Sequence, residues 1–329
     1  MQIIPVTIFA AMSTIAEAEQ NYISQLSTLY DQAESKSIAW WCINHVCKIS
    51  KAVFLASKNE ALSSEKEDAL NLLLKELITG KPVQYVLGET EFYGLPFKVN
   101  PSVLIPRPET EELVDWVLIE LRNRMNAAVS LKAEGKAFVS EGVENDKITL
   151  EALIYENELV RILDLGTGSG CIPISIKKYL PEVELTGVDI SAGALQTANG
   201  NANLNQVSVE FIEDSILNMR NDAILNTQYS VIISNPPYVT ESEKSGMFKN
   251  VLEHEPHQAL FVPDINALIF YNSIADFAVN HLVKSGLLFF EINENLGPDM
   301  VSLLETKGFS DIELRQDIRG KNRMIRATI

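Results

Sequence analysis

The segment Asn235-Pro236-Pro237-Tyr238 follows an apolar run that is typical of a buried strand. Proline fixes φ and has no backbone N–H, so two prolines in a row stiffen the loop. We expect the Asn235 side-chain oxygen and the Pro236 carbonyl to face a cleft, where two acceptors match the two N–H groups of one NH2. Tyr238 offers a flat surface for stacking on a planar amide or base. The alternative is a rigid proline turn with Asn235 as a local cap.

A glycine-rich stretch, "DLGTGSG", follows an earlier apolar run and precedes a helical pattern. Its glycines allow the backbone to turn sharply at the carboxyl end of a strand and to approach a ligand closely. A tight turn without a ligand is the alternative, because such a loop alone is weak evidence. The residues of this candidate cofactor loop are Asp164, Gly166, Thr167, Gly168, Ser169 and Gly170.

Two further aspartates stand at the ends of later strand patterns. Asp189 lies 19 residues after Gly170, where its carboxylate can accept hydrogen bonds from both ribose hydroxyls of a nucleoside. Asp189 followed by a capping Ser191 could instead be purely structural. Asp214 ends the next strand and could meet an adenine amino group, or it is a solvated loop aspartate. Together with the glycine loop, these residues favour an adenosine-containing ligand.

The cofactor is expected to be S-adenosylmethionine rather than a dinucleotide. The loop reads GxGxG, not GxGxxG, and no segment is placed for a pyrophosphate. S-adenosylmethionine carries no phosphate, so Asp164 can sit near its ammonium group or, through water, near its positive methionyl part. With this methyl donor, the two acceptors at Asn235 and Pro236 can orient a poorly nucleophilic amide nitrogen for in-line attack without a strong base.

The elements that position these residues form an α/β fold. Short apolar runs at 161–165, 183–189, 207–213, 229–235 and 286–292 alternate with amphipathic segments, which predicts a Rossmann-like parallel sheet covered by helices. The C-terminal segment predicts an antiparallel hairpin at the sheet edge. We therefore divide the chain into a helical N-terminal substrate-recognition domain (1–80), a β-hairpin linker (81–105) and a methyltransferase domain (106–329). A polar stretch, 126–157, is interpreted as a variable insertion with a short helix near Leu150.

The N-terminal region has an apolar residue every three or four positions, which is the helical period. One helix is predicted to begin at a capping box of Ser64 and Glu67 and to end at Gly80. Cys42 and Cys47 fit one helix better than a metal site, and we expect no metal.

Composition narrows the class of protein. The chain has 329 residues, 46% of them hydrophobic and 22% charged, which is ordinary for a globular protein. Its net charge of −17 disfavours nucleic-acid binding. The start has no basic flank for a secretory signal, no apolar run reaches the length of a membrane span, and the three cysteines suit a reducing cytoplasm.

Taken in order, "DLGTGSG", "GVDIS" and "SNPPYV" resemble the class I S-adenosylmethionine-dependent methyltransferases that modify planar amino groups. More narrowly, the segments 80–114, 253–260 ("EHEPHQAL") and the closing "DIRGKNRMIRA" are similar to the bacterial release factor glutamine methyltransferase (HemK/PrmC) family. In the related ribosomal-protein glutamine methyltransferases, which remain an alternative, the PRPETE stretch differs.

This resemblance implies a substrate and roles for the motif residues. The substrate would be the glutamine of the GGQ motif of peptide chain release factors, methylated on its side-chain amide nitrogen, with S-adenosylhomocysteine as the product. The stretch 166–170 and Asp189 would hold the donor, and the stretch 235–238 would hold the glutamine. Arg107 and Glu109 would line the cofactor mouth or form a loop ion pair. We expect a cytoplasmic monomer that acts on a protein and contacts neither nucleic acid nor membrane.

The chain departs from the family pattern at three places. It reads "FVPDINAL" (261–268) where a glycine-rich loop is usual, and "EIN" (291–293) where "EIG" is usual. Ser215 occupies the position where some members place an aromatic residue beside adenine, which leaves the adenine-stacking partner unassigned.

Two other functions are alternatives for the same motifs. A DNA adenine amino-methyltransferase would use the same Asn-Pro-Pro-Tyr geometry, but it must flip a base and follow phosphates, and the acidic chain lacks an obvious basic recognition region. A non-enzymatic adaptor would have lost some of the expected polar groups, whereas every one of them is present.

Overall fold

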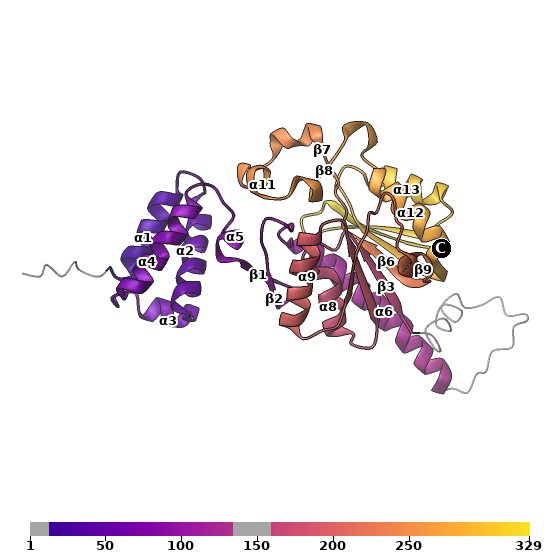
Figure 1. The fold of residues 1–329 in the computed structure, drawn as a ribbon, viewed down its shortest axis with the longest axis horizontal. Helices are drawn as coiled ribbons and strands as arrows, with labels where there is room; N and C mark the ends of the chain where they lie inside the picture. The colour runs from indigo at the N-terminus through magenta and orange to yellow at the C-terminus, as the bar shows by residue number, and fades with distance from the viewer. Residues whose placement is uncertain (1–12, 134–158) are drawn as a thin grey trace, which may run out of the picture. The chain divides into compact units, whose positions relative to one another are not determined.

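The computed structural model describes residues 13–133 and 159–329, which fall into two compact units (Figure 1). One unit contains the chain up to Gly88 together with Phe248–His254, and the other contains Glu89–Met247 together with Glu255–Ile329. The predicted insertion begins inside a long helix, α6 (Pro108–Ala133). The remainder of the insertion, with the helix expected near Leu150, lies outside the described residues.

The first unit is helical, as predicted. Thr14 and Glu17 form a capping box at its start, where the Thr14 N–H donates to Glu17 Oε2 over 2.7 Å and the Glu17 N–H donates to Thr14 Oγ1 over 3.2 Å. Cys42 and Cys47 share one helix, as expected. The unit contains α1 (Ile15–Leu26), α2 (Gln32–Cys47), α3 (Lys51–Ala56), α4 (Ser64–Leu77) and α5 (Val83–Leu87), together with α11 (Lys249–His254).

The predicted capping box at Ser64 is wrong by one residue. Ser63 has the extended backbone of an N-cap, and its side chain accepts a hydrogen bond from the Lys66 N–H. Ser64 is already the first residue of α4. Two adjacent serines satisfy the same local pattern, so the sequence could not decide which one caps the helix.

The second unit is built on a seven-stranded sheet in the order β10-β11-β9-β6-β3-β4-β5. The strands from β9 to β5 run parallel, and β11 pairs antiparallel with both β9 and β10, which confirms the predicted fold class and the C-terminal edge hairpin. The strands are β3 (Arg161–Leu165), β4 (Glu184–Asp189), β5 (Glu210–Glu213), β6 (Tyr229–Ser234), β9 (Leu282–Glu291), β10 (Ser310–Gln316) and β11 (Asn322–Thr328).

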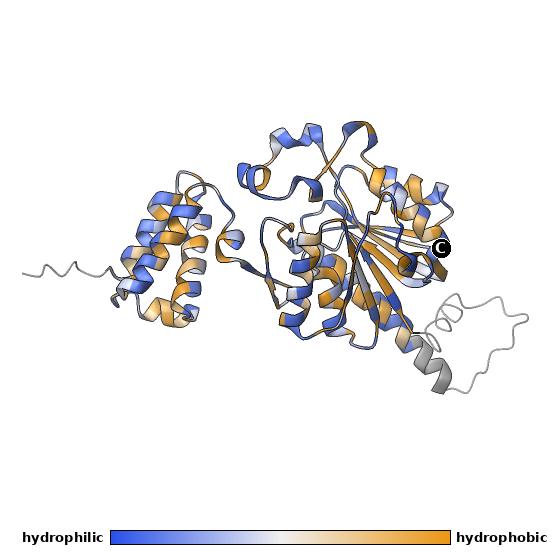
Figure 2. Ribbon diagram, in the orientation of Figure 1, coloured by the Kyte–Doolittle hydropathy of each residue, from blue (hydrophilic) through white to orange (hydrophobic). Residues whose placement is uncertain are grey.

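Helices cover both faces of the sheet. The helices are α6, α8 (Cys171–Tyr179), α9 (Ala192–Asn205), α10 (Asp222–Leu225), α12 (Ile269–His281) and α13 (Gly297–Thr306). Successive residues of a strand point to opposite faces: Phe289 joins the core that includes Trp116 of α6, whereas Phe290 joins the core that includes Tyr271 of α12. Because both faces are buried at the centre of the sheet, the central strands β3, β6 and β9 are largely apolar, and Figure 2 shows hydrophobic residues along them.

A predicted hairpin, β1 (Glu89–Phe92) with β2 (Leu95–Lys98), belongs to the second unit. The buried Asn201 of α9 attaches it to that helix and to the glycine loop: Asn201 Oδ1 accepts from the Lys98 N–H over 2.7 Å, and Asn201 Nδ2 donates to the Ser169 carbonyl over 2.9 Å. The segment between β6 and α12 carries β7 (Val239–Thr240), β8 (Phe261–Val262) and the 3-10 helices η1 (Glu241–Gly246), η2 (His257–Ala259) and η3 (Asp264–Asn266). None of the helices in the described ranges is both long and apolar enough for a membrane span.

Register brings the strand ends to one level. Leu165 at the end of β3 pairs with Val188 of β4 and with Ser234 of β6, and Ser234 pairs in turn with Phe290 of β9. The loops that carry the glycines, Asp189 and Asn235 therefore all begin at the carboxyl edge of the sheet, where open α/β sheets bind ligands.

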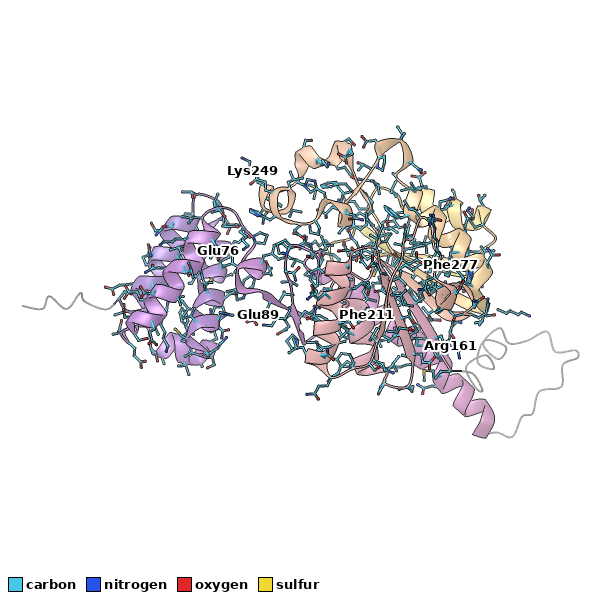
Figure 3. The ribbon with its side chains drawn as sticks, viewed as in Figure 1. Glu76, Glu89, Arg161, Phe211, Lys249 and Phe277 are labelled. Carbon is cyan, nitrogen blue, oxygen red and sulfur yellow. The ribbon has the colours of Figure 1, made fainter. Side chains whose placement is uncertain are left out.

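We expect Gly187→Ala to destabilise the second unit. A Cβ at Gly187 of β4 would lie 2.8 Å from both Phe211 Cδ1 and Thr167 Oγ1, so the Phe211 ring, which is labelled in Figure 3, would have to move. Overpacking of this kind costs about 1 to 3 kcal/mol. Gly200→Ala, on helix α9 with nothing within 4 Å, is the matched control and should be neutral or stabilising by up to about 1 kcal/mol. Urea unfolding of both variants measures the difference, and equal stabilities would contradict the packing argument.

Candidate active site

The glycine loop connects β3 to α8. Gly166, Gly168 and Gly170 have φ values of +81°, +54° and +77°, in the left-handed region that favours glycine. Gly170 has a second constraint, because a Cβ there would lie 2.9 Å from Ile174 Cδ1 and 3.1 Å from the Ala198 Cβ. The loop therefore needs glycine for its backbone and for the close approach of α8 and α9.

Asp189 fixes this loop from the end of β4. Its Oδ2 accepts a hydrogen bond from the Gly168 N–H over 2.8 Å, and its Oδ1 accepts one from the Ser191 N–H over 2.9 Å. Burial raises the pKa of Asp189, although these backbone donors oppose the rise. A carboxylate has about four lone-pair sites, so each oxygen keeps capacity for one more donor. The geometry fits a ligand with two vicinal hydroxyls.

A cavity of about 1200 Å³, including its part open to solvent, lies at this edge of the sheet. It brings together most of the residues predicted for the cofactor. The predicted residues that line it are Arg107, Gly166, Thr167, Gly168, Ser169, Asp189, Ser215, Asn235 and Pro237. The predicted residues that do not line it are Glu109, Asp164, Gly170, Asp214, Pro236 and Tyr238.

Sequence reasoning missed the apolar wall of the cavity. Ile190, Ile216 and Leu217 line it, and Ile190 and Leu217 are 51% and 45% exposed, which is high for such apolar residues. A large apolar side chain directly after Asp189 and another shortly after Asp214 were the available signals. This wall offers an apolar surface for a purine, in a chain that has Ser215 at the position considered for stacking.

Asp164 lies beneath the loop, on β3, and its side chain is fully buried. No described residue completes a hydrogen bond to either carboxylate oxygen, and the Thr167 hydroxyl is likewise without a partner among the described residues. Burial raises the pKa of Asp164 from 3.8 to about 7, the nearby Thr167 side chain opposes the rise and the charge of Asp189 adds to it. Such an orphaned buried carboxyl fits a site that is completed by a cationic group or by water.

Asp214 caps a loop instead of facing the cavity. Its Oδ1 accepts from the Ser215 N–H over 2.7 Å, and its Oδ2 accepts from the Arg220 and Asn221 N–H groups, both over 2.8 Å. Burial acts to raise the pKa of Asp214, but these donors hold it below its usual value. This arrangement matches the alternative interpretation of Asp214 as a structural loop residue.

The Asn-Pro-Pro-Tyr loop follows β6. Asn235 Nδ2 donates to Thr110 Oγ1 over 3.2 Å, and no described residue donates to its Oδ1. Pro236 is buried and Pro237 lines the cavity. The Tyr238 hydroxyl donates to Glu291 Oε1 over 3.0 Å, and the Tyr238 ring packs against the core on the α12 face. The stacking role of Tyr238 therefore stays a prediction.

The departure at Asn293 supports this loop. Asn293 Nδ2 donates to the Tyr238 carbonyl over 3.2 Å and to Glu243 Oε2 over 3.0 Å. A glycine could make neither bond. Asn293 thus connects the end of β9 to the Asn-Pro-Pro-Tyr loop and to η1. The "EIN" segment by itself did not indicate this connection.

Arg107 reaches the cavity and forms an ion pair with the buried Glu255, whose Oε2 also accepts from the Ile105 N–H over 3.2 Å. Glu109 Oε1 lies 3.6 Å from Nη1 of Arg319, a pair in which Arg319 is exposed and Glu109 is partly buried. The two residues predicted together are therefore separated: Arg107 lines the cavity and Glu109 does not. Glu255 was missed because it stands 148 residues away in the chain.

The chain is similar to known proteins over most of its length. A "Methyltransferase small domain" model matches residues 130–261, and a "PrmC N-terminal domain" model matches residues 17–88. The chain is 39% identical to the release factor glutamine methyltransferase of Flavobacterium psychrophilum, over 93% of this chain and 95% of that one. It is 36% identical to the protein of the same name from Bacteroides thetaiotaomicron, over 93% and 97%.

Among solved structures, the chain is similar in fold to the hMettl16 catalytic domain, determined in complex with an RNA hairpin. The TM-score is 0.50, with 15% identity over 74% of this chain and 80% of that one. This likeness shows the fold alone.

We expect Asp164 to make the stability of the unliganded protein fall as pH rises. Its pKa is higher in the folded state, about 7, than the ordinary 3.8, so the unfolded chain releases this proton first. The contribution is complete below about pH 4 and is lost by about pH 7, at about 1.4 kcal/mol per pH unit. Asp164→Asn should remove this slope. Urea unfolding of both proteins at pH 5, 6, 7 and 8 tests it, and a stability difference that does not change with pH would contradict it.

Proposed function

Because this chain belongs to the release factor glutamine methyltransferase family, we propose that it transfers a methyl group from S-adenosylmethionine to the side-chain amide nitrogen of the GGQ glutamine in peptide chain release factors. The observation that carries the proposal is that Asn235 lines the same cavity as Asp189 and the glycine loop. A carboxamide held at Asn235 is then adjacent to a nucleoside held at Asp189.

The cofactor would be held by residues of three strand ends. Asp189 has free acceptor capacity for the ribose hydroxyls, and the apolar wall of Ile190, Ile216 and Leu217 suits adenine. The buried Asp164 carboxyl, without a partner among the described residues, supports a positive methionyl part above it. When bound, S-adenosylmethionine supplies an electrophilic methyl group on a sulfonium, and it leaves as S-adenosylhomocysteine.

The chain's own groups orient the acceptor nitrogen. Asn235, which lines the cavity, would accept one N–H group of the substrate carboxamide through Oδ1. The second acceptor in this proposal is the carbonyl of the adjacent Pro236, a buried residue that does not itself line the cavity. An amide lone pair is delocalised, and acceptors on both N–H groups favour the positive charge that develops on nitrogen during attack. The alkylated nitrogen is acidic and loses a proton readily. Methyl transfer to an amide held by Asn235 and Pro236 therefore requires no strong base nearby.

The helical unit is proposed to recognise the surface of the release factor outside the GGQ loop. One glutamine side chain offers far less area than a specific protein contact, which usually buries about 800 Å² on each partner. The match of residues 17–88 to the PrmC N-terminal domain supports a dedicated role for this unit. The same proposal takes the enzyme to be a cytoplasmic monomer. It takes the substrate to be a protein and not a nucleic acid, since a net charge of −17 disfavours nucleic-acid binding. The molar mass of the purified enzyme, measured by light scattering, tests whether it is a monomer.

Asn235→Ala should reduce methyl transfer by about 100-fold to 1000-fold, because it removes one of two preorganised acceptors. The affinity for S-adenosylmethionine, measured by calorimetry, should change by less than about threefold, since binding rests on the glycine loop and Asp189. Asn280→Ala, at an exposed position of α12, is the control and should retain full activity.

The readout is mass spectrometry of the GGQ peptide from release factor incubated with enzyme and cofactor, with duplex DNA as a parallel substrate. Methylated DNA and unmodified glutamine would refute the proposed substrate.

Deleting residues 1–80 should lower kcat/KM on intact release factor by at least about tenfold, because the proposed recognition surface is lost. Activity on a short GGQ peptide, which cannot reach that surface, should stay the same. Cofactor affinity verifies that the second unit is folded. An undiminished kcat/KM on the intact factor would show that the helical unit does not recognise the substrate.

A further inference from the structure

Three side chains that are distant in sequence form a buried hydrogen-bond chain behind the cavity. Asn235 follows β6, Thr110 lies in the first turn of α6 and Glu291 ends β9. Asn235 Nδ2 lies 3.2 Å from Thr110 Oγ1, which lies 2.6 Å from Glu291 Oε2. Glu291 Oε1 accepts from the Tyr238 hydroxyl over 3.0 Å. Only Asn235 and Thr110 of these residues line the cavity.

The number of available donor protons decides which group donates in each of these hydrogen bonds. The two oxygens of an ionised Glu291 can only accept, and with Glu291 in that form the single hydroxyl proton of Thr110 is directed to it. The Thr110 oxygen then has only lone pairs left for Asn235, and it must receive an N–H from the Asn235 amide. Consequently the Asn235 NH2 faces Thr110 and Oδ1 faces away from it. This orientation follows from the proton count and not from the shape of the amide, whose two ends look alike.

We propose that Thr110 and Glu291 are positioning residues that set the polarity of the Asn235 amide, so that an acceptor and not a donor is presented to the substrate nitrogen. This inference rests on the proposed function, since it concerns the same Asn235 grip. A freely rotating amide would present NH2 to the substrate part of the time, and two donors facing each other repel.

The surroundings of Glu291 suit this role. Its side chain is 1% exposed, and its two oxygens are each satisfied by one O–H donor, from Thr110 and from Tyr238. Burial raises the pKa of Glu291, while the two hydroxyl donors and the charge of Arg323 oppose the rise and the charge of Glu109 adds to it. Tyr238 thus has a function away from the cavity, as the second donor that holds the carboxylate in place.

A purely structural role is the competing explanation, because the same contacts connect α6 to the sheet. It predicts that changes in Thr110 and Glu291 alter unfolding and cofactor affinity along with activity. The positioning role predicts that kcat falls while the cofactor affinity stays close to wild type. The unfolding temperature of Thr110→Val falls under either explanation, because one oxygen of the buried Glu291 loses its hydroxyl donor, so the cofactor affinity separates the two.

The test uses the full-length enzyme and intact release factor. Thr110→Val keeps the side-chain shape and removes the hydroxyl, so kcat should fall by about tenfold to 100-fold through loss of orientation. Thr110→Ser keeps the hydroxyl and should restore kcat to within about threefold of wild type. Glu291→Gln offers one donor and one acceptor and no longer imposes a direction, so it should also lower kcat. The kcat of the double variant Thr110→Val with Glu291→Gln should be no lower than that of the poorer single variant, because both residues act through the same series of hydrogen bonds to Asn235.

The outcomes separate this inference from the proposed function. Thr110→Val with wild-type kcat beside an inactive Asn235→Ala would overturn the positioning role alone. Losses that multiply in the double variant, or a Thr110→Ser as poor as Thr110→Val, would also overturn it. If wild type itself leaves release factor unmodified, the proposed function fails. Should Thr110→Val not fold, the kcat of Glu291→Gln decides, and a value equal to wild type rejects the inference.

Discussion

The site depends on the common register of the parallel strands. Pairing of β3 with β4 and β6, and of β6 with β9, ends these strands at one level, so each following loop begins at the same edge. Backbone hydrogen bonding therefore places Asp189, Asn235 and Glu291 at the same edge of the sheet before any side chain interacts. A shift of one residue in any pair would turn alternate side chains to the opposite face. Because both faces of the central strands are buried, the register is specified by close packing on each face and not by an alternation of apolar and polar residues.

Three carboxyl groups share this edge, and each is accommodated differently. Asp189 is held by backbone N–H groups, Glu291 by two hydroxyl donors, and Asp164 by no described donor. Burying a carboxylate is costly unless it is hydrogen-bonded, so the burial of Asp164, which does not line the cavity, is the least compensated of the three. An acidic edge of this kind suits a ligand with positive charge and no phosphate. The acidic charge of the site therefore favours the proposed methyl donor, S-adenosylmethionine, which is positively charged and carries no phosphate.

The departures from the family pattern modify the support of the substrate loop and leave its acceptors in place. Asn293 adds hydrogen bonds to the Tyr238 carbonyl and to Glu243, where a glycine would add none. In the segment that replaces the glycine-rich loop, Phe261 pairs through β8 with Val239 of β7. The hydrogen bonds of Asn293 depend on its side chain, whereas the β7–β8 pairing is made by the backbone.

The sequence by itself determined the elements and the strand-end motifs, because these are encoded locally by apolar period, glycine and proline. It specified the glycine loop, Asp189 and the Asn235 loop, and it located a helix start to within one residue at Ser63. Only the tertiary structure decided which polar groups meet. Thr110 contacts residues 125 and 181 positions away, and Asp164, which is local to the glycine loop, lies beneath it and not in the cavity wall. Such contacts depend on how helices and strands pack, and no periodicity along the chain records which side chains packing will bring together.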